Sequence, residues 1–165
     1  MTTESKGNIS SQKQHLRRFL AVQALFALDS SADPAGTLRL LADDWELLGF
    51  HGDELEIDDE TASQLPAISA EDCGAAVQWA ERVWSHLDQV DSLIAPCLRG
   101  WRLPRLDGVD RAILRLCFFA SRVEGSVNDA VAASEAVILA KAMGGEQSAK
   151  FVNGVIGSIM GGEGQ

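Results

Sequence analysis

The sequence predicts an all-α fold of about seven helices. In its last third, apolar side chains recur at helical spacing from Val127 to Met143 and again from 146 to 160. Gly144-Gly145 separates these two segments, as glycine does just past the end of a helix. No alternating apolar run of useful length occurs in the chain, so we expect no strands.

The pair Asn153-Gly154 can be interpreted in two ways. Asn-Gly between apolar residues is the strongest short-range signal for a β-hairpin. A helix is favoured because few β-branched residues precede the pair and because glycine ends the preceding helix nearby. Glycine inside a helix costs about 1 kcal/mol relative to alanine, so we expect a second helix or a ligand to approach Gly154 closely. The apolar positions of this helix are Phe151, Val152, Val155, Ile156, Ile159 and Met160.

Capping residues and apolar stripes predict the other helices. Ser11 precedes a segment from Gln12 to Asp29 that is apolar nearly all round at its centre, which is typical of a buried helix. Ser69 and Asp72 have the spacing of a capping box, which marks a helix start. The remaining predicted helices span 35–48, 69–89, 90–98 and 108–122, the last of them capped by Asp107.

Length and composition predict one domain with polar ends. We expect a disordered arm over 1–10, a single helical domain over 11–160 and a disordered tail over 161–165. Within the domain, 11–68 would form an N-terminal subdomain with an acidic linker at about 50–68, and 69–160 would supply the C-terminal helices. The chain has no apolar run long enough for a membrane span and no signal-peptide core, so we expect a cytoplasmic protein.

The charge of the chain is unevenly distributed. Its net charge is −10, but residues 43–60 alone contribute −9 and contain no lysine or arginine, so the rest of the chain sums to −1. Two segments are locally basic, 1–20 and 99–115, each with a sum of +3. Local basic patches, rather than the total charge, decide where phosphates bind.

Cysteine, histidine and motif patterns argue against catalysis and metal binding. No two of these side chains have the spacing of zinc ligands or of a disulfide framework. The chain has no nucleophile elbow, no metalloprotease motif and no phosphate-binding loop. We therefore expect no enzyme activity, no metal and no cofactor. The cysteines are Cys73, Cys97 and Cys117, and the histidines are His15, His51 and His86.

Four blocks of sequence, in the same order along the chain, resemble the transcription antitermination factor NusB family. They span residues 18–26, 109–116, 131–141 and 151–155. The resemblance implies an all-helical fold of two small packed bundles without catalytic activity. It also implies binding of boxA, a short single-stranded RNA element of rRNA leaders, jointly with a small-subunit ribosomal protein that acts as NusE. Such a protein works in the RNA polymerase antitermination complex and supports rRNA transcription. Homodimers occur in this fold, and nothing in the sequence selects one.

Basic and aromatic side chains near both ends are the candidate RNA contacts. Phosphate neutralisation supplies much of RNA affinity, and unpaired bases stack on aromatic rings. The alternatives are a solvated helix start for the α-helical cations near the N-terminus and core packing for the aromatics. Lys150 could instead contact a protein partner, and Asn153 could cap a neighbouring helix. The candidate RNA-binding residues are Lys13, Arg17, Arg18, Phe26, Lys150, Phe151 and Asn153. Only the resemblance supports a partner-binding set of Glu135, Glu146 and Gln147.

Other charged and aromatic residues have simpler explanations. Arg111 and Arg115 stand one helical turn apart with Asp107 and Asp110 nearby, which favours internal ion pairing. The three cysteines, Cys73, Cys97 and Cys117, are best explained as small buried hydrophobes. The tryptophans Trp79 and Trp84 are best explained as core anchors.

The chain departs from the family pattern in ways that favour a second hypothesis. Only Arg18 clearly keeps a family arginine at the N-terminus, Arg17 lies one position off, and 49–68 is an acidic insertion. The alternative is a divergent helical protein–protein interaction module that has lost RNA recognition. In that case the acidic segment binds a basic protein, mimics nucleic acid or shields the basic patches. Further departures are Ala133, Ser134 and Ile138.

Overall fold

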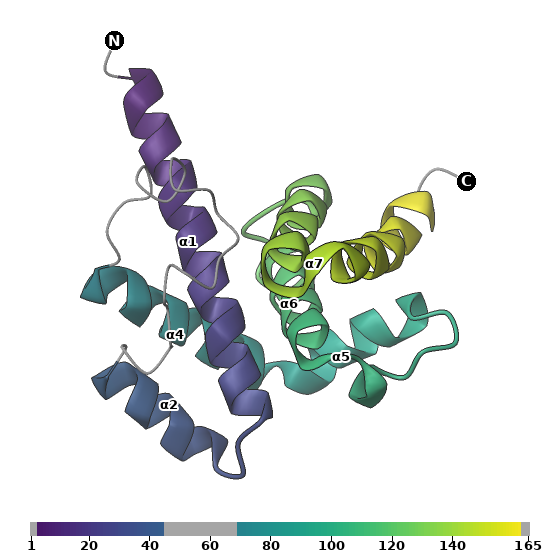
Figure 1. The fold of residues 1–165 in the computed structure, drawn as a ribbon, viewed down its shortest axis with the longest axis horizontal. Coiled ribbons are helices and arrows are strands. Elements are labelled where there is room, and N and C mark those ends of the chain that lie inside the picture. Colours follow the sequence, from purple (N-terminus) through teal and green to yellow (C-terminus); the bar gives the residue numbers. More distant parts are fainter. Residues whose placement is uncertain (1–2, 45–68, 163–165) are drawn as a thin grey trace. The chain divides into compact units, whose positions relative to one another are not determined.

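The computed structural model describes residues 3–44 and 69–162, with side chains over 11–44 and 69–158. Within these ranges the secondary structure is helical and contains no strand, which confirms the all-α prediction (Figure 1). None of the described helices is long and apolar enough to span a membrane. The α-helices are α1 (Thr3–Asp29), α2 (Pro34–Asp43), α4 (Ala70–Ser85), α5 (Leu87–Ile94), α6 (Gly108–Phe118) and α7 (Asp129–Gly162). Short helical turns η3 (Ala95–Cys97) and η4 (Leu103–Arg105) and a π-helix η5 (Phe119–Val123) complete the set.

Contacts divide the chain into two compact units, Met1–Glu81 and Arg82–Gln165. The boundary falls inside α4, whereas the sequence suggested a division between 68 and 69. A side-chain hydrogen bond between α1 and α4 accounts for part of this difference, since it ties the first half of α4 to the first unit. The predicted linker at 50–68 lies outside the described residues, and the division into domains stays a prediction.

In the first unit, α1 carries the predicted apolar centre and packs against α2. The helix begins at Thr3 and not at Gln12, so the predicted N-cap Ser11 lies inside it, and residues from Thr3 onward that we expected to be disordered are helical. A polar segment without proline can extend a helix that already has its nucleus, because propagation costs far less than nucleation. The buried residues of α1 are Leu16, Phe19, Leu20, Ala21, Val22, Ala24, Leu25 and Leu28.

Helix starts follow the predicted caps more closely than helix ends do. The Ser69 hydroxyl accepts the Asp72 N–H at 3.1 Å, and Asp107 Oδ1 accepts the Val109 N–H at 3.0 Å, so both caps are confirmed. Asp33 caps α2 in the same way, with Pro34 in the first turn. The helix predicted over 69–89 instead ends at Ser85, and α5 begins at Leu87.

Two further predicted helices have different ends in the structure. The helix predicted over 90–98 starts earlier, at Leu87, and its α-helical part ends at Ile94. Pro96 lacks an N–H and cannot continue the ladder, so the chain tightens into η3 there. The helix predicted over 108–122 widens after Phe118 into the π-helix η5.

In the second unit, α6 packs against both α5 and α7. Every residue of α6 from Ala112 to Phe118 is buried, including the charged Arg115. Trp84, predicted to be a core anchor, is half-buried in this unit, whereas the other predicted anchor, Trp79, belongs to the first unit and is buried. The largest fully buried side chains of the second unit are Val83, Val90, Ile94, Ile113, Leu114, Leu116, Leu139 and Val152.

The helix α7 is bent at the predicted glycine pair. Gly145 has φ +84° and ψ −168°, which is outside the helical region, and the two halves run in different directions from it (Figure 1). The Asn153-Gly154 pair lies within the second half, so the helix is confirmed and the hairpin is excluded. Of the two neighbours expected at Gly154, the second helix is wrong among the described residues, because a Cβ there would meet nothing within 4 Å, and the ligand stays a prediction.

Alanine substitutions at the two glycines should have opposite effects on stability. Gly145→Ala should lower the free energy of unfolding by about 1–2 kcal/mol, because an L-residue is strained at positive φ. Gly154→Ala should raise it by about 1 kcal/mol, because alanine is the better helix former and its methyl group meets open space. Urea denaturation of both variants measures the difference, and a stabilised Gly145→Ala variant would contradict the bend.

Candidate nucleic-acid interface

An open hollow of about 290 Å³ lies in the second unit, between the second half of α7 and the chain that follows η3. Cations and aromatic rings meet in it, and its lining includes no acidic side chain. Two of the sequence-predicted RNA-binding residues, Lys150 and Phe151, belong to this lining. The full lining set is Cys97, Leu98, Arg99, Trp101, Lys150, Phe151, Gly154 and Val155.

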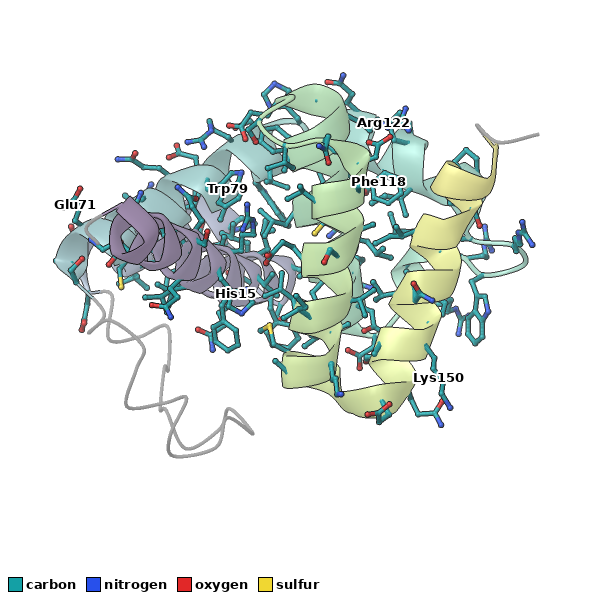
Figure 2. The ribbon with its side chains drawn as sticks, turned by 90° about the horizontal axis from the view of Figure 1, so that it is seen from above. His15, Glu71, Trp79, Phe118, Arg122 and Lys150 are labelled. Carbon is teal, nitrogen blue, oxygen red and sulfur yellow. The ribbon has the colours of Figure 1, made fainter. Side chains whose placement is uncertain are left out.

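The second half of α7 forms one wall of the hollow. Lys150 is exposed and projects from this half of the helix into the open (Figure 2), while Phe151 is half-buried. Gly154 has no side chain to fill the space beside them. Asn153, also predicted to bind RNA, is exposed but is not part of the lining, and its side chain makes no hydrogen bond to a described residue.

A tight turn forms the opposite wall. The Trp101 N–H donates to the Leu98 carbonyl at 2.6 Å, and Gly100 adopts φ +89° inside this turn, a conformation that favours glycine. Leu98 is buried and anchors the turn, whereas Trp101 is 61% exposed. The Trp101 and Phe151 rings meet edge to face, with centroids 6.0 Å apart and planes at 75°. Neither Arg99 nor Trp101 is among the site residues that the sequence predicts.

Arg111 holds the backbone that follows this turn. Its guanidinium donates to the Leu106 carbonyl at 2.9 Å and to the Leu103 carbonyl at 3.3 Å. Both carbonyls lie at or next to η4, so one α6 side chain fixes the segment just beyond Trp101. Arg111 therefore has a structural role in positioning this wall.

Arg115 forms the internal ion pair that the sequence predicted, with a partner that the sequence did not identify. Its Nε donates to Asp91 Oδ1 at 2.9 Å and its Nη2 donates to Asp91 Oδ2 at 3.0 Å. This two-pronged geometry is the strong form of an arginine–carboxylate contact. The pair joins α6 to α5.

The α1 candidates lie in the first unit, and Arg17 is occupied there. Its Nε donates to Asp72 Oδ1 at 2.9 Å, and the Asp72 side chain is only 1% exposed. The Ser69 hydroxyl donates to the other carboxylate oxygen at 2.8 Å. Burial raises the pKa of the Asp72 carboxyl, but the hydrogen bonds from Ser69 and Arg17 and the arginine charge outweigh it and hold the pKa below its ordinary value of 3.8. Arg17 thus neutralises a buried carboxylate.

The remaining α1 candidates are Lys13, Arg18 and Phe26. Lys13 and Arg18 are half-buried, and Arg18 has a further interaction of its own. Phe26 is 43% exposed, so the core alternative considered for this ring is wrong. Its neighbours Leu25 and Leu28 are buried, which places Phe26 on the outer face of α1.

The predicted partner-binding residues lie on both sides of the α7 bend. Glu135 is half-buried and already has an interaction within the chain. Glu146 is exposed, with its Oε1 3.7 Å from Lys141 Nζ, and Gln147 is exposed. Their role in partner binding stays a prediction.

Asp110 is a second buried carboxyl, and its environment differs from that of Asp72. Burial raises the pKa of Asp110, the nearby Asp107 raises it further, and a hydrogen bond with Ser148 lowers it, so the net direction is upward from 3.8. Its Oδ1 is buried without a hydrogen-bond partner. A carboxyl in such a place is favoured in its neutral form.

The raised pKa of Asp110 predicts a pH-dependent effect of Asp110→Asn on stability. Since the folded-state pKa lies above the unfolded value, Asp110 supports folding below the unfolded pKa and loses that contribution as pH rises through the folded pKa. Asparagine cannot ionise and avoids this loss. The free energy of unfolding of the variant, relative to that of wild type, should therefore increase from about pH 4 to about pH 7. Urea midpoints at both pH values measure this. A gain that shrinks toward neutral pH would contradict the raised pKa.

Metal binding has no support among the described residues, where no three potential ligands from histidine, cysteine, aspartate and glutamate come together. Cys73 and Cys117 are buried, as predicted for small hydrophobes. Cys97 is half-buried and lines the hollow instead.

Comparison with known proteins agrees with this fold and gives it a family. The model of the NusB family matches residues 15–161. The chain is 37% identical to the transcription antitermination protein NusB of Symbiobacterium thermophilum, over 87% of this chain and 86% of that protein. It is 32% identical to the NusB protein of an Exiguobacterium species, over 90% and 97% of the two chains.

Two solved structures share the fold. NusB of T. maritima superposes with a TM-score of 0.57 at 28% identity, over 88% of each chain. A structure described as "Crystal Structure of a Plectonemic RNA Supercoil" superposes with a TM-score of 0.52 at 24% identity, over 89% of this chain and 96% of that one, and supports the fold alone. From the extent of these matches, the chain belongs to the NusB family, whose members are transcription antitermination proteins and not enzymes.

Proposed function

We propose that this protein binds a boxA-like single-stranded RNA from rRNA leaders together with the small-subunit ribosomal protein NusE, and so supports rRNA transcription in the cytoplasm. In this role it would be a part of the RNA polymerase antitermination complex. Membership in the NusB family supports the antitermination role. The observation that carries the RNA proposal is the hollow in which the exposed cation of Lys150 stands beside the Phe151 ring.

The chemistry of the hollow suits single-stranded RNA. A lysine ammonium neutralises a phosphate, and an aromatic ring offers a face or an edge to an unpaired base. On α1, Lys13 and Arg18 are the proposed phosphate contacts and Phe26 is the proposed exposed ring. Glu135, Glu146 and Gln147 on α7 remain the proposed contacts to NusE, and Asn153 remains a proposed RNA contact from the exposed side of the same helix.

The direct test is a titration of labelled boxA RNA with the full chain, with and without NusE, at several salt concentrations. We expect tighter binding with NusE, and affinity that falls steeply with salt. Lys150→Ala should reduce the slope of log affinity against log salt by about 0.7, the value for one phosphate contact on a single strand. Arg39→Ala, which removes an exposed cation on α2, is the matched control and should leave both quantities unchanged. Absence of RNA binding at low salt with NusE present would reject the proposal.

A second candidate is the divergent interaction module without RNA recognition. The ion pair of Arg17 with Asp72 favours it, because it removes one arginine from the set available to phosphates. Deleting residues 50–62 separates the possibilities. Tighter RNA binding after the deletion would mean that the acidic segment shields the basic patches, and unchanged binding would exclude shielding.

A further inference from the structure

We propose that the turn Arg99-Gly100-Trp101 is the second wall of the RNA site, in which the Trp101 indole stacks on one unpaired base and the Arg99 guanidinium binds an adjoining phosphate. The inference rests on the proposed function and adds two residues to the RNA site, one that stacks on a base and one that binds a phosphate. Both side chains line the same hollow as Lys150 and Phe151.

The exposure of Trp101 is the first observation. An indole is one of the largest apolar groups a protein can present, yet 61% of this residue faces solvent on a turn with defined hydrogen bonding. Its edge-to-face contact with Phe151 uses only part of the ring system. Base–aromatic stacking requires an accessible ring held in place, and every nucleobase has a face that can stack.

The charge of the hollow is the second observation, and it favours an anionic ligand over an apolar one. Arg99 and Lys150 stand on opposite walls, both are exposed, and neither forms an ion pair with a described residue. No acid is present among the lining residues. Alternating phosphates and bases are the chemistry that meets two cations and two rings together.

The rigidity of the turn is the third observation. Gly100 permits the positive φ that the turn needs, buried Leu98 anchors its start, and Arg111 fixes the backbone beyond it. A wall that is ordered before the ligand arrives loses little conformational entropy on binding. A solvent-exposed ring on such a turn is thus suited to recognition.

Trp101→Ala tests the stacking role by titration of labelled boxA RNA with the full chain and NusE. Loss of one stacked base should weaken affinity about 5- to 100-fold. Trp101→Phe keeps a ring and should recover most of the affinity. Leu40→Ala is the matched control, because Leu40 is equally exposed, at 60%, on α2 in the other unit. It should bind RNA as wild type does, and thermal unfolding of all variants checks that each is folded.

Arg99→Ala tests the phosphate role through the salt dependence of the same binding. We expect the slope of log affinity against log salt to fall by about 0.7, as one phosphate contact is lost. Arg105→Ala is its matched control, since Arg105 is an exposed cation of the same loop that does not line the hollow. Equal slopes for Arg99→Ala and wild type would overturn the phosphate assignment.

Three outcomes separate this inference from the proposed function. RNA affinity of Trp101→Ala within about 2-fold of wild type, while Lys150→Ala loses affinity, would overturn the inference and keep the function. A loss of NusE affinity by Trp101→Ala without a loss of RNA affinity would assign the ring to the protein partner and also overturn it. A wild-type chain that binds no RNA would reject both.

Discussion

Asp91→Ala should lower the free energy of unfolding by about 3 kcal/mol, because it leaves the buried guanidinium of Arg115 without its two-pronged partner. The Arg115 side chain is 8% exposed and that of Asp91 is 27% exposed, so the effect should fall at the low end of the range for buried ion pairs. The ion pair links α5 to α6, and α6 also packs against α7. Loss of the pair should therefore weaken the packing of α6 in the second unit.

Urea denaturation measures this effect, and Asp88→Ala is the matched control. Asp88 is an exposed aspartate in the first turn of the same helix, where its favourable interaction with the helix dipole amounts to about 0.5 kcal/mol. Equal losses for the two variants would show that the Asp91 contact adds nothing beyond a surface charge.

Arg17→Ala should lower the free energy of unfolding by about 2 kcal/mol, the range for a hydrogen bond to a charged group. Its removal leaves the buried Asp72 carboxylate with Ser69 and a backbone N–H as partners. The loss should be largest at neutral pH. The pKa of folded Asp72 lies below its unfolded value, so its stabilisation is present above the unfolded pKa and disappears as pH falls through the folded pKa.

The same variant distinguishes a structural arginine from an RNA-binding one. If Arg17 serves Asp72, then Arg17→Ala lowers the unfolding midpoint but leaves the salt slope of RNA binding unchanged, whereas Arg18→Ala lowers that slope. Asp72→Asn should recover part of the stability in the Arg17→Ala background, since the uncompensated charge is gone. An unchanged midpoint with a reduced slope for Arg17→Ala would assign the guanidinium to RNA instead.

Local signals explain what the sequence predicted correctly. Local sequence patterns predict the caps at Ser69 and Asp107 and the glycine break in α7, because each depends on residues a few positions apart. The end of α4 at Ser85 could not be predicted in this way, because no proline or glycine marks it. For Phe26, a candidate RNA contact, the apolar neighbours along the chain offered core packing as the alternative, but its place on the outer face of α1 leaves it exposed.

Pairings between distant segments could not be predicted from the sequence. Arg17 meets Asp72 across 55 positions and Arg115 meets Asp91 across 24, and no local pattern specifies such partners. Of the site, Phe151 lies in a family motif, and Lys150 was a basic residue directly before it. Arg99 and Trp101 did not, although a glycine between a basic and an aromatic residue could have marked an exposed turn there.

The bend at Gly145 has a consequence for cooperativity. Because α7 bends there, its two halves lie in the second unit together with α6, against which α7 packs. A straight helix of the same length would extend away from α6. Opening α6 therefore removes the packing surface of its neighbours, and the amide protons of α6 and of both halves of α7 should exchange with solvent as one cooperative group. A ligand seated against the second half of α7 would slow the exchange of that whole group, including amides far from any contact with it.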